Sequence, residues 1–200
     1  SSAASDVYKR QPVNLRGVSN LLDDICGYFP DPSTRPCAGI NLNTNEIFEA
    51  NYDFAKPKSA TIFKTIVDPF LGKYSLIKVC SGVIKSDDTL LNVEKGEEER
   101  LNKLYVLEGS KPLEVPELHA GDIGAIAKLA SVQTGDSLAA KASPVLYPKA
   151  VISTPYTYKR YKAVKKGDED KIAQALAKMA SEDKTLRVVN DSANRQTLLY

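Results

Sequence analysis

The sequence has no tryptophan, one histidine, one methionine and three cysteines among its 200 residues. A single histidine without a second close ligand argues against a zinc site, and three widely spaced cysteines do not make a disulfide framework. We therefore expect Cys26, Cys37 and Cys80 to be reduced thiols in a cytoplasmic protein. No apolar run approaches the roughly 18 residues of a membrane span, and no secretory signal pattern opens the chain. We expect no membrane partner.

A large excess of one charge is also missing. The chain has 27 basic and 25 acidic residues, a formal net charge of +2. This balance is too small for bulk charge to hold a nucleic acid, so a polyanionic partner would have to meet a local patch. With 42% hydrophobic and 26% charged residues, the composition predicts a globular chain with one ordinary domain or two small ones.

The first part of the chain predicts little structure of its own. Residues 1–11 have neither helical nor strand periodicity. We interpret them as an unstructured tail or as a scar, meaning residues left over from cloning or sequence assembly. Apolar residues then recur at helical spacing between 18 and 29, and Pro30, Pro32 and Pro36 end the pattern. One short helix cannot bury its apolar face alone. Residues 12–45 are therefore interpreted as the last helix of a domain lying upstream, followed by a proline-rich linker.

The middle of the chain, residues 46–147, has the periodicity of β-strands. Its segments are rich in Val, Ile, Thr and Tyr and are separated by turn signals. The strands are predicted at 60–67, 73–80, 89–93, 101–107 and 123–129. Short strands at this spacing predict a closed antiparallel β-barrel.

The last segment, residues 148–200, predicts a strand at 151–158, a helix at 168–181 and a hairpin at 186–199. Asp168 is predicted to cap the helix. This β-α-β-β order is the first half of a split β-α-β, ferredoxin-like fold. The fold class is therefore a β-barrel followed by an incomplete α/β domain, with one short helix and a linker at the N-terminus.

Several motifs occur in an order that resembles a known family. They include DPFLGK at 68–73, SGVIKS at 81–86, EVPELHAGDI at 114–123, TGDSL at 134–138 and IAQALAKM at 172–179. From about Pro12 to the end, the chain is similar to elongation factor G, the ribosomal translocase. The resemblance implies the end of the GTPase domain, then a translation-factor domain II and the N-terminal half of domain III.

The resemblance also implies a function for the full-length protein. We expect a GTPase that uses GTP and Mg²⁺ to move tRNA and mRNA on the ribosome, contacting small-subunit rRNA and ribosomal proteins as a monomer. The basic segment 156–166 and Pro148-Lys149-Ala150 depart from the family pattern and indicate a paralogue. A ribosomal protection protein and a protein similar to release factor 3 are alternatives. An alternative of another class is a stand-alone barrel that binds nucleic acid or protein without a GTPase.

No catalytic, cofactor or metal residue is predicted in this fragment. A GTPase needs a phosphate loop, and the sequence contains no G-x-x-x-x-G-K-[ST]. We interpret Gly121 to Gly124 as a strand and turn. Cys80 with His119, or His119 with Asp122, is a weak site by spacing, so Cys80 is predicted to be a core residue and His119 a turn residue.

Two groups of basic residues are predicted to face ribosomal RNA. The first is a stretch without acidic residues, interleaved with Tyr156, Tyr158 and Tyr161, in which cations would pair phosphates and aromatic rings would stack on bases. The alternative is a solvated strand end whose tyrosines pack on the sheet. The residues of this stretch are Lys159, Arg160, Lys162, Lys165 and Lys166. The second group follows from domain II of the family, which contacts small-subunit rRNA, and comprises Lys73, Lys85, Arg100 and Lys103.

The absent phosphate loop generates the first prediction. We expect this chain alone neither to bind nor to hydrolyse GTP, because no residues are present to hold the phosphates. Isothermal titration with GTP and Mg²⁺ measures this directly. Saturable binding below millimolar concentration would contradict the prediction.

Overall fold

In this computed structural model the chain divides into two compact units, residues 1–35 and residues 36–200. The structure describes residues 14–31, 34–68, 72–109, 111–129, 131–165, 167–191 and 196–200. The predicted tail at 1–11 lies outside the described residues.

Helix α1 (Val18–Tyr28) is the described helix of the first unit and confirms the predicted short helix. It begins after Gly17, whose φ of 76° is in the left-handed region. None of its residues is buried, and its apolar side chains, Leu21, Leu22 and Ile25, are exposed. An 11-residue helix gains too little from backbone hydrogen bonds to be stable alone, so this face needs a packing partner.

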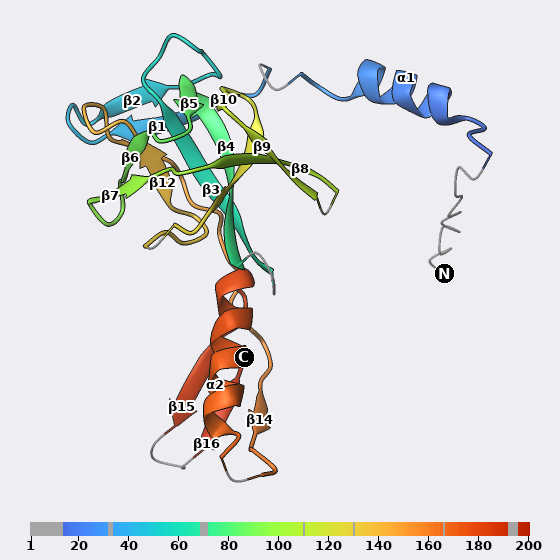
Figure 1. The fold of residues 1–200 in the computed structure, drawn as a ribbon, viewed down its shortest axis with the longest axis vertical. Coiled ribbons are helices and arrows are strands. Elements are labelled where there is room, and N and C mark those ends of the chain that lie inside the picture. The colour runs from blue at the N-terminus through green and yellow to red at the C-terminus, as the bar shows by residue number, and fades with distance from the viewer. Residues whose placement is uncertain are drawn as a thin grey trace. The chain divides into compact units, whose positions relative to one another are not determined.

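Most of the second unit is an antiparallel β-barrel-like fold (Figure 1). Its strands are β1 (Ala38–Asn41), β2 (Glu46–Glu49), β3 (Ser59–Asp68), β4 (Gly72–Ser81), β5 (Val83–Lys85), β6 (Thr89–Asn92), β7 (Glu97–Arg100), β8 (Leu104–Glu108), β9 (Lys111–Val115), β10 (Glu117–His119), β11 (Ile123–Ala127), β12 (Ser137–Ala139) and β13 (Val145–Leu146). The main sheet has the order β7-β6-β12-β3-β4-β11-β8-β9. Two smaller sheets, β13-β1-β2 and β10-β5, complete the fold.

Strand β4 lies in the middle of the main sheet, and both of its faces are covered. Ile77 and Val79 point into the main core, whereas Tyr74 and Leu76 belong to a second apolar cluster and Cys80 to a third. The main core also contains Ile62, Ile84, Leu104, Leu118, Ile126 and Leu138. A strand buried on both faces has apolar residues at successive positions, and within residues 76–80 only Lys78 interrupts the apolar run.

Two glycines are required by close packing in the barrel. Gly82 follows β4 with a φ of 72°, and a Cβ atom there would lie 2.8 Å from the Lys56 carbonyl oxygen. Gly124 lies inside β11, where a Cβ atom would lie 2.3 Å from a methyl group of Leu118. Gly121 has a φ of 96° and lies in the turn before β11. The interpretation of Gly121 to Gly124 as a strand and turn is therefore confirmed.

A buried polar network connects the barrel strands. The Ser59 hydroxyl lies 2.5 Å from the Ser81 hydroxyl and 2.7 Å from the Tyr147 hydroxyl, and the Ser137 hydroxyl accepts the Tyr147 N–H at 3.0 Å. Burial raises the pKa of Tyr147, so its phenol stays protonated and remains a donor. No buried side-chain nitrogen or oxygen atom lacks a partner in the described part of the chain.

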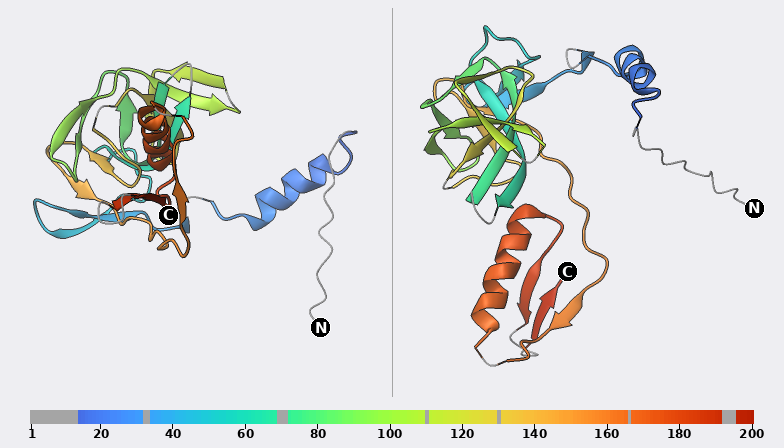
Figure 2. Two further views of the ribbon diagram at one scale, coloured as in Figure 1. Left: turned by 90° about the horizontal axis from the view of Figure 1, so that it is seen from below. Right: turned by 45° about the vertical axis from the view of Figure 1, so that its right-hand side comes forward.

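The C-terminal segment forms a small α/β layer (Figure 2). Strand β14 (Lys159–Tyr161) precedes helix α2 (Glu169–Glu182), and strands β15 (Val188–Asp191) and β16 (Gln196–Leu199) form the hairpin. The sheet order is β14-β16-β15, and α2 lies along one face. The predicted β-α-β-β order is confirmed, and with it the predicted fold class.

Some predicted details of this segment are wrong. Residues 151–158 do not form a strand, and the first strand of this segment is β14. Pro155 has no backbone N–H to donate, and no described strand pairs with its neighbours. Asp168 is the N-cap residue but makes no side-chain cap hydrogen bond. Instead, its carboxylate accepts a hydrogen bond from Lys171 at 3.3 Å, and Glu169 accepts the Gly167 N–H at 2.7 Å.

The barrel also differs from its prediction in four respects. Residues 101–103 lie between strands, and the strand predicted at 123–129 ends at Ala127, because Lys128 has a φ of 61°. Among the described residues the main sheet ends at β7 and β9, so no continuous ladder closes the barrel. Residues 38–41, predicted to be linker, form β1, which pairs with β13.

The uneven packing generates a prediction about proteolysis. Leu198 is the one buried residue in the described part of the chain after Pro148, and residues 149–160 are mostly exposed. We expect limited proteolysis to cut after about Pro148 before it cuts within 60–138, since cleavage follows local opening. Mass spectrometry of early fragments measures the order of cuts. Equal protection of both segments would contradict this expectation.

Candidate nucleic-acid interface

The C-terminal basic stretch lies on β14 and in the loop that follows it. Lys159, Arg160, Lys162 and Lys165 are all exposed, and Lys166 lies outside the described residues. None of the four pairs with a carboxylate in the part of the chain that the structure describes. Unpaired ammonium and guanidinium groups keep their full charge available for an anionic partner.

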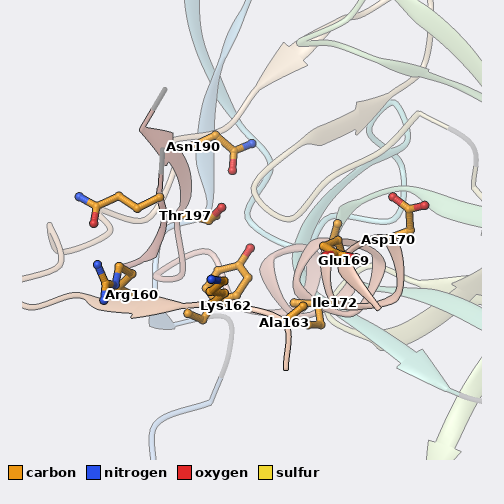
Figure 3. A pocket seen from close by; sticks show the side chains of 11 residues that line it. Arg160, Lys162, Ala163, Glu169, Asp170, Ile172, Asn190 and Thr197 are labelled. Atoms are coloured by element: carbon orange, nitrogen blue, oxygen red, sulfur yellow. The ribbon is translucent and has the colours of Figure 1, made fainter. Parts of the chain in front are cut away.

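A cavity of about 530 Å³ lies beside this stretch (Figure 3). Arg160 and Lys162 line it from the β14 side, whereas Glu169 and Asp170 line it from the first turn of α2. Backbone hydrogen bonds from its own N–H and from Gly167 lower the pKa of Glu169, so that carboxylate is ionised at neutral pH. A phosphate inside the cavity would meet negative charge, and the outer edge of β14 is the better place for it.

The three tyrosines of the stretch have different environments. Tyr156 is 98% exposed, and its ring is open to stacking. Tyr158 packs against Tyr200 with ring centroids 5.2 Å apart, and Tyr161 is half-buried. Tyr156 is therefore accessible to a stacking base, whereas Tyr158 and Tyr161 pack on the protein.

Three of the four barrel candidates are held by carboxylates. Arg100 donates to Asp87 at 3.0 Å, Lys103 donates to Glu114 at 2.7 Å, and the Lys85 ammonium lies 3.9 Å from Glu117. The hydrogen bond that Lys103 donates to Glu114 raises the pKa of Lys103. All three cations are exposed, but their charge is locally neutralised. They stay candidates for RNA contact, with less free charge than the C-terminal stretch.

Lys73 has a different environment, which sequence spacing does not indicate. Its ammonium donates to the Val132 carbonyl oxygen at 2.9 Å. Burial is the main cause that lowers its pKa, and repulsion from Lys95 and Lys184 adds to it. Lys95 donates to the Ser131 carbonyl oxygen, and Lys184 to the Gln133 side chain at 3.1 Å. A loop at 131–136 thus gathers lysines from distant parts of the chain, and of these only Lys73 was a predicted candidate for RNA contact.

Asp136 anchors this loop. Its carboxylate is 4% exposed and accepts hydrogen bonds from the Asn92 amide at 3.0 Å and the Gln133 N–H at 2.9 Å. The Lys149 ammonium lies 3.9 Å from it. Asp122 makes the same type of turn bond, to the His119 N–H at 2.8 Å, but is half-exposed. Both aspartates therefore accept hydrogen bonds from backbone N–H groups of their own turns.

The residues of the two weak sites take part in packing and strand pairing in the structure. Cys80 is a buried core residue, as predicted. His119 ends strand β10 instead of lying in the turn, because it pairs with Val83, and its ring packs edge-on against Phe54. No group of three metal-ligating side chains occurs among the residues that the structure describes.

None of the described helices is long and apolar enough to cross a membrane.

Comparison with known families decides what these surfaces belong to. Residues 57–141 match the model of elongation factor G domain 2, and residues 152–200 match the model of elongation factor G domain III. The two matches follow one another and span about two thirds of the chain. The chain belongs to the elongation factor G family.

A solved structure agrees with these matches. A crystal structure of a protein from Thermus thermophilus is 28% identical in sequence, with a TM-score of 0.72. The match covers 92% of this chain and 25% of that protein, so this elongation factor G-like chain spans about a quarter of its length. The four barrel candidates lie in the domain II match, and the C-terminal basic stretch lies in the domain III match.

The burial of Asp136 generates a prediction about the lysine-bearing loop. Asp136→Ala is expected to lower the free energy of unfolding by about 2 to 3 kcal/mol, because it leaves buried donors unpaired. Asp122→Ala is the matched control, with an expected loss of about 1 kcal/mol or less at its half-exposed turn. Urea denaturation followed by circular dichroism measures both. Equal losses in the two variants would show that burial of Asp136 is unimportant.

Proposed function

We propose that this elongation factor G-like chain docks on the ribosome through its domain II and domain III segments, during movement of tRNA and mRNA. The observation that carries the proposal is the row of exposed, unpaired cations at Lys159, Arg160, Lys162 and Lys165. It lies in a segment that matches domain III of a translation factor. The ribosomal partner is small-subunit rRNA together with ribosomal proteins, and the factor acts in the cytoplasm as a monomer.

The physical basis is counterion release. RNA phosphates hold condensed cations, and each protein cation that replaces one releases it into solution. A cation already paired with a carboxylate must first give up that partner, so its net contribution is smaller. This difference ranks the C-terminal stretch above Lys85, Arg100 and Lys103 as a source of affinity. The barrel cations then contribute mainly to orientation.

The two segments have different parts in this proposal. The barrel, which has the larger buried core, acts as the anchor, and the α/β segment transmits the nucleotide state of the factor. GTP and Mg²⁺ are assigned to the full-length protein, outside this chain, because the sequence contains no phosphate loop to hold them. No step of nucleotide chemistry is assigned to residues of this chain.

The prediction concerns the salt dependence of ribosome binding by the full-length factor. Replacing Lys159, Arg160, Lys162, Lys165 and Lys166 together by Gln is expected to lower affinity. The slope of log affinity against log salt should fall by up to about 0.7 to 0.9 per lost phosphate contact. Co-sedimentation with ribosomes across a salt series measures both quantities. The melting temperature should barely change, since exposed cations contribute little to folding.

A charge-matched control separates a local interface from bulk charge. The control variant carries Gln at five other exposed lysines: Lys64, Lys111, Lys128, Lys141 and Lys178. It loses the same formal charge, and we expect a clearly smaller change in slope. An unchanged slope in the first variant, with the fold intact, would contradict the proposal. Equal changes in both variants would contradict it too, because they would reflect net charge alone.

A further inference from the structure

Cys37 and Cys80 are far apart in the sequence but adjacent in the barrel. Both thiols belong to one apolar cluster, which also contains Ala50, Ala139, Val145 and Tyr147. Cys37 packs against the buried residues of this cluster, Cys80 among them. Cys37 is partly accessible and Cys80 is buried, and neither forms a disulfide in this structure.

The backbone holds the two cysteines together through one short turn. The Cys37 carbonyl oxygen accepts the Ala50 N–H at 2.8 Å and the Asn51 N–H at 3.1 Å, and the Asn51 side chain accepts the Cys37 N–H at 3.1 Å. The next residue, Tyr52, donates its N–H to the Cys80 carbonyl oxygen at 3.0 Å. Consecutive residues of one turn therefore position both cysteines.

We propose that Cys37 and Cys80 form a reversible dithiol–disulfide site, in which Cys37 reacts with a hydroperoxide and Cys80 then closes the disulfide. The arrangement has the two parts that such chemistry needs: a thiol that solvent reaches and a second thiol held against it. Cys26, on α1, is also a free thiol and is exposed. The site is independent of the proposed ribosome contacts.

The electrostatics of the pair support different roles for the two thiols. The hydrogen bond with Cys80 lowers the pKa of Cys37 to about 7; burial opposes this, while Lys78 and the Tyr52 hydroxyl favour the thiolate. The same hydrogen bond is the main cause that raises the pKa of Cys80, and burial adds to it. Cys37 is therefore about half thiolate at neutral pH, and Cys80 is a protonated thiol.

The reaction balances with one hydroperoxide. The Cys37 thiolate attacks an oxygen atom, the O–O bond breaks, and the leaving alkoxide takes a proton to become an alcohol. Cys37 is then a neutral sulfenic acid. Its thiolate charge, which had raised the pKa of Cys80, is gone, so Cys80 can lose its proton more easily. The Cys80 sulfur attacks the Cys37 sulfur, its proton leaves with the hydroxide as water, and the S–S bond forms. The two thiols lose two electrons, and the hydroperoxide gains them.

The experiment is peroxide treatment of the full chain, followed by differential alkylation and peptide mass mapping. We expect a Cys37–Cys80 linked peptide that dithiothreitol removes, with Cys26 remaining alkylatable. The rate of Cys37 alkylation should rise with pH around a midpoint near 7, against about 8.5 for a free cysteine peptide. In urea the linked peptide should fall at least severalfold, because the fold that holds the thiols together is lost.

Three variants test the assigned roles. Cys80→Ser keeps a donor beside Cys37 but removes the second thiol, so dimedone should trap a sulfenic acid on Cys37 while the alkylation midpoint stays low. Cys80→Ala also removes the donor, and the midpoint should move up. Cys26→Ala, the matched control, should leave the linked peptide unchanged. Absence of the linked peptide in the folded wild type, or equal yield in urea, would overturn the proposal.

Discussion

Two-sided burial of strand β4 is the constraint on which the rest of the barrel depends. Its side chains supply three apolar clusters, and its neighbours β3 and β11 satisfy its backbone on both edges. Water is thereby excluded from both faces, so a polar group there needs an internal partner. Ser81 at its end satisfies this rule through Ser59 and the Pro57 carbonyl oxygen.

Charge pairing separates the two candidate RNA surfaces more clearly than charge count does. The barrel cations sit opposite carboxylates on neighbouring strands or turns, as Lys103 does with Glu114. The C-terminal stretch has no acidic residue within it, and its described cations have no carboxylate partner in the described part of the chain. Free charge on a small α/β layer suits an interface whose binding responds to salt. In the proposed function, the carboxylate-paired barrel cations Lys85, Arg100 and Lys103 therefore contribute mainly to positioning.

The sequence predicted helices and strands correctly where apolar residues recur on one or both faces of a long segment. Helix α2 and the β15–β16 hairpin were found in this way. The strand at 151–158 failed because strand propensity does not supply a partner strand, and Val151 remains almost fully exposed. Short strands such as β12 were missed, because three residues carry no periodicity. Local pattern therefore found the long elements and missed the short ones.

The amino-acid sequence by itself determined the fold class, the family resemblance and the absence of a phosphate loop, because each depends on residues close together in the chain. Only the tertiary structure decided which cations are free and which thiols meet. The Lys103–Glu114 pair and the Cys37–Cys80 pair arise from strand register and from the turn at Asn51 and Tyr52. Such contacts join residues far apart in the sequence, and their energies depend on burial and distance, which no local spacing contains.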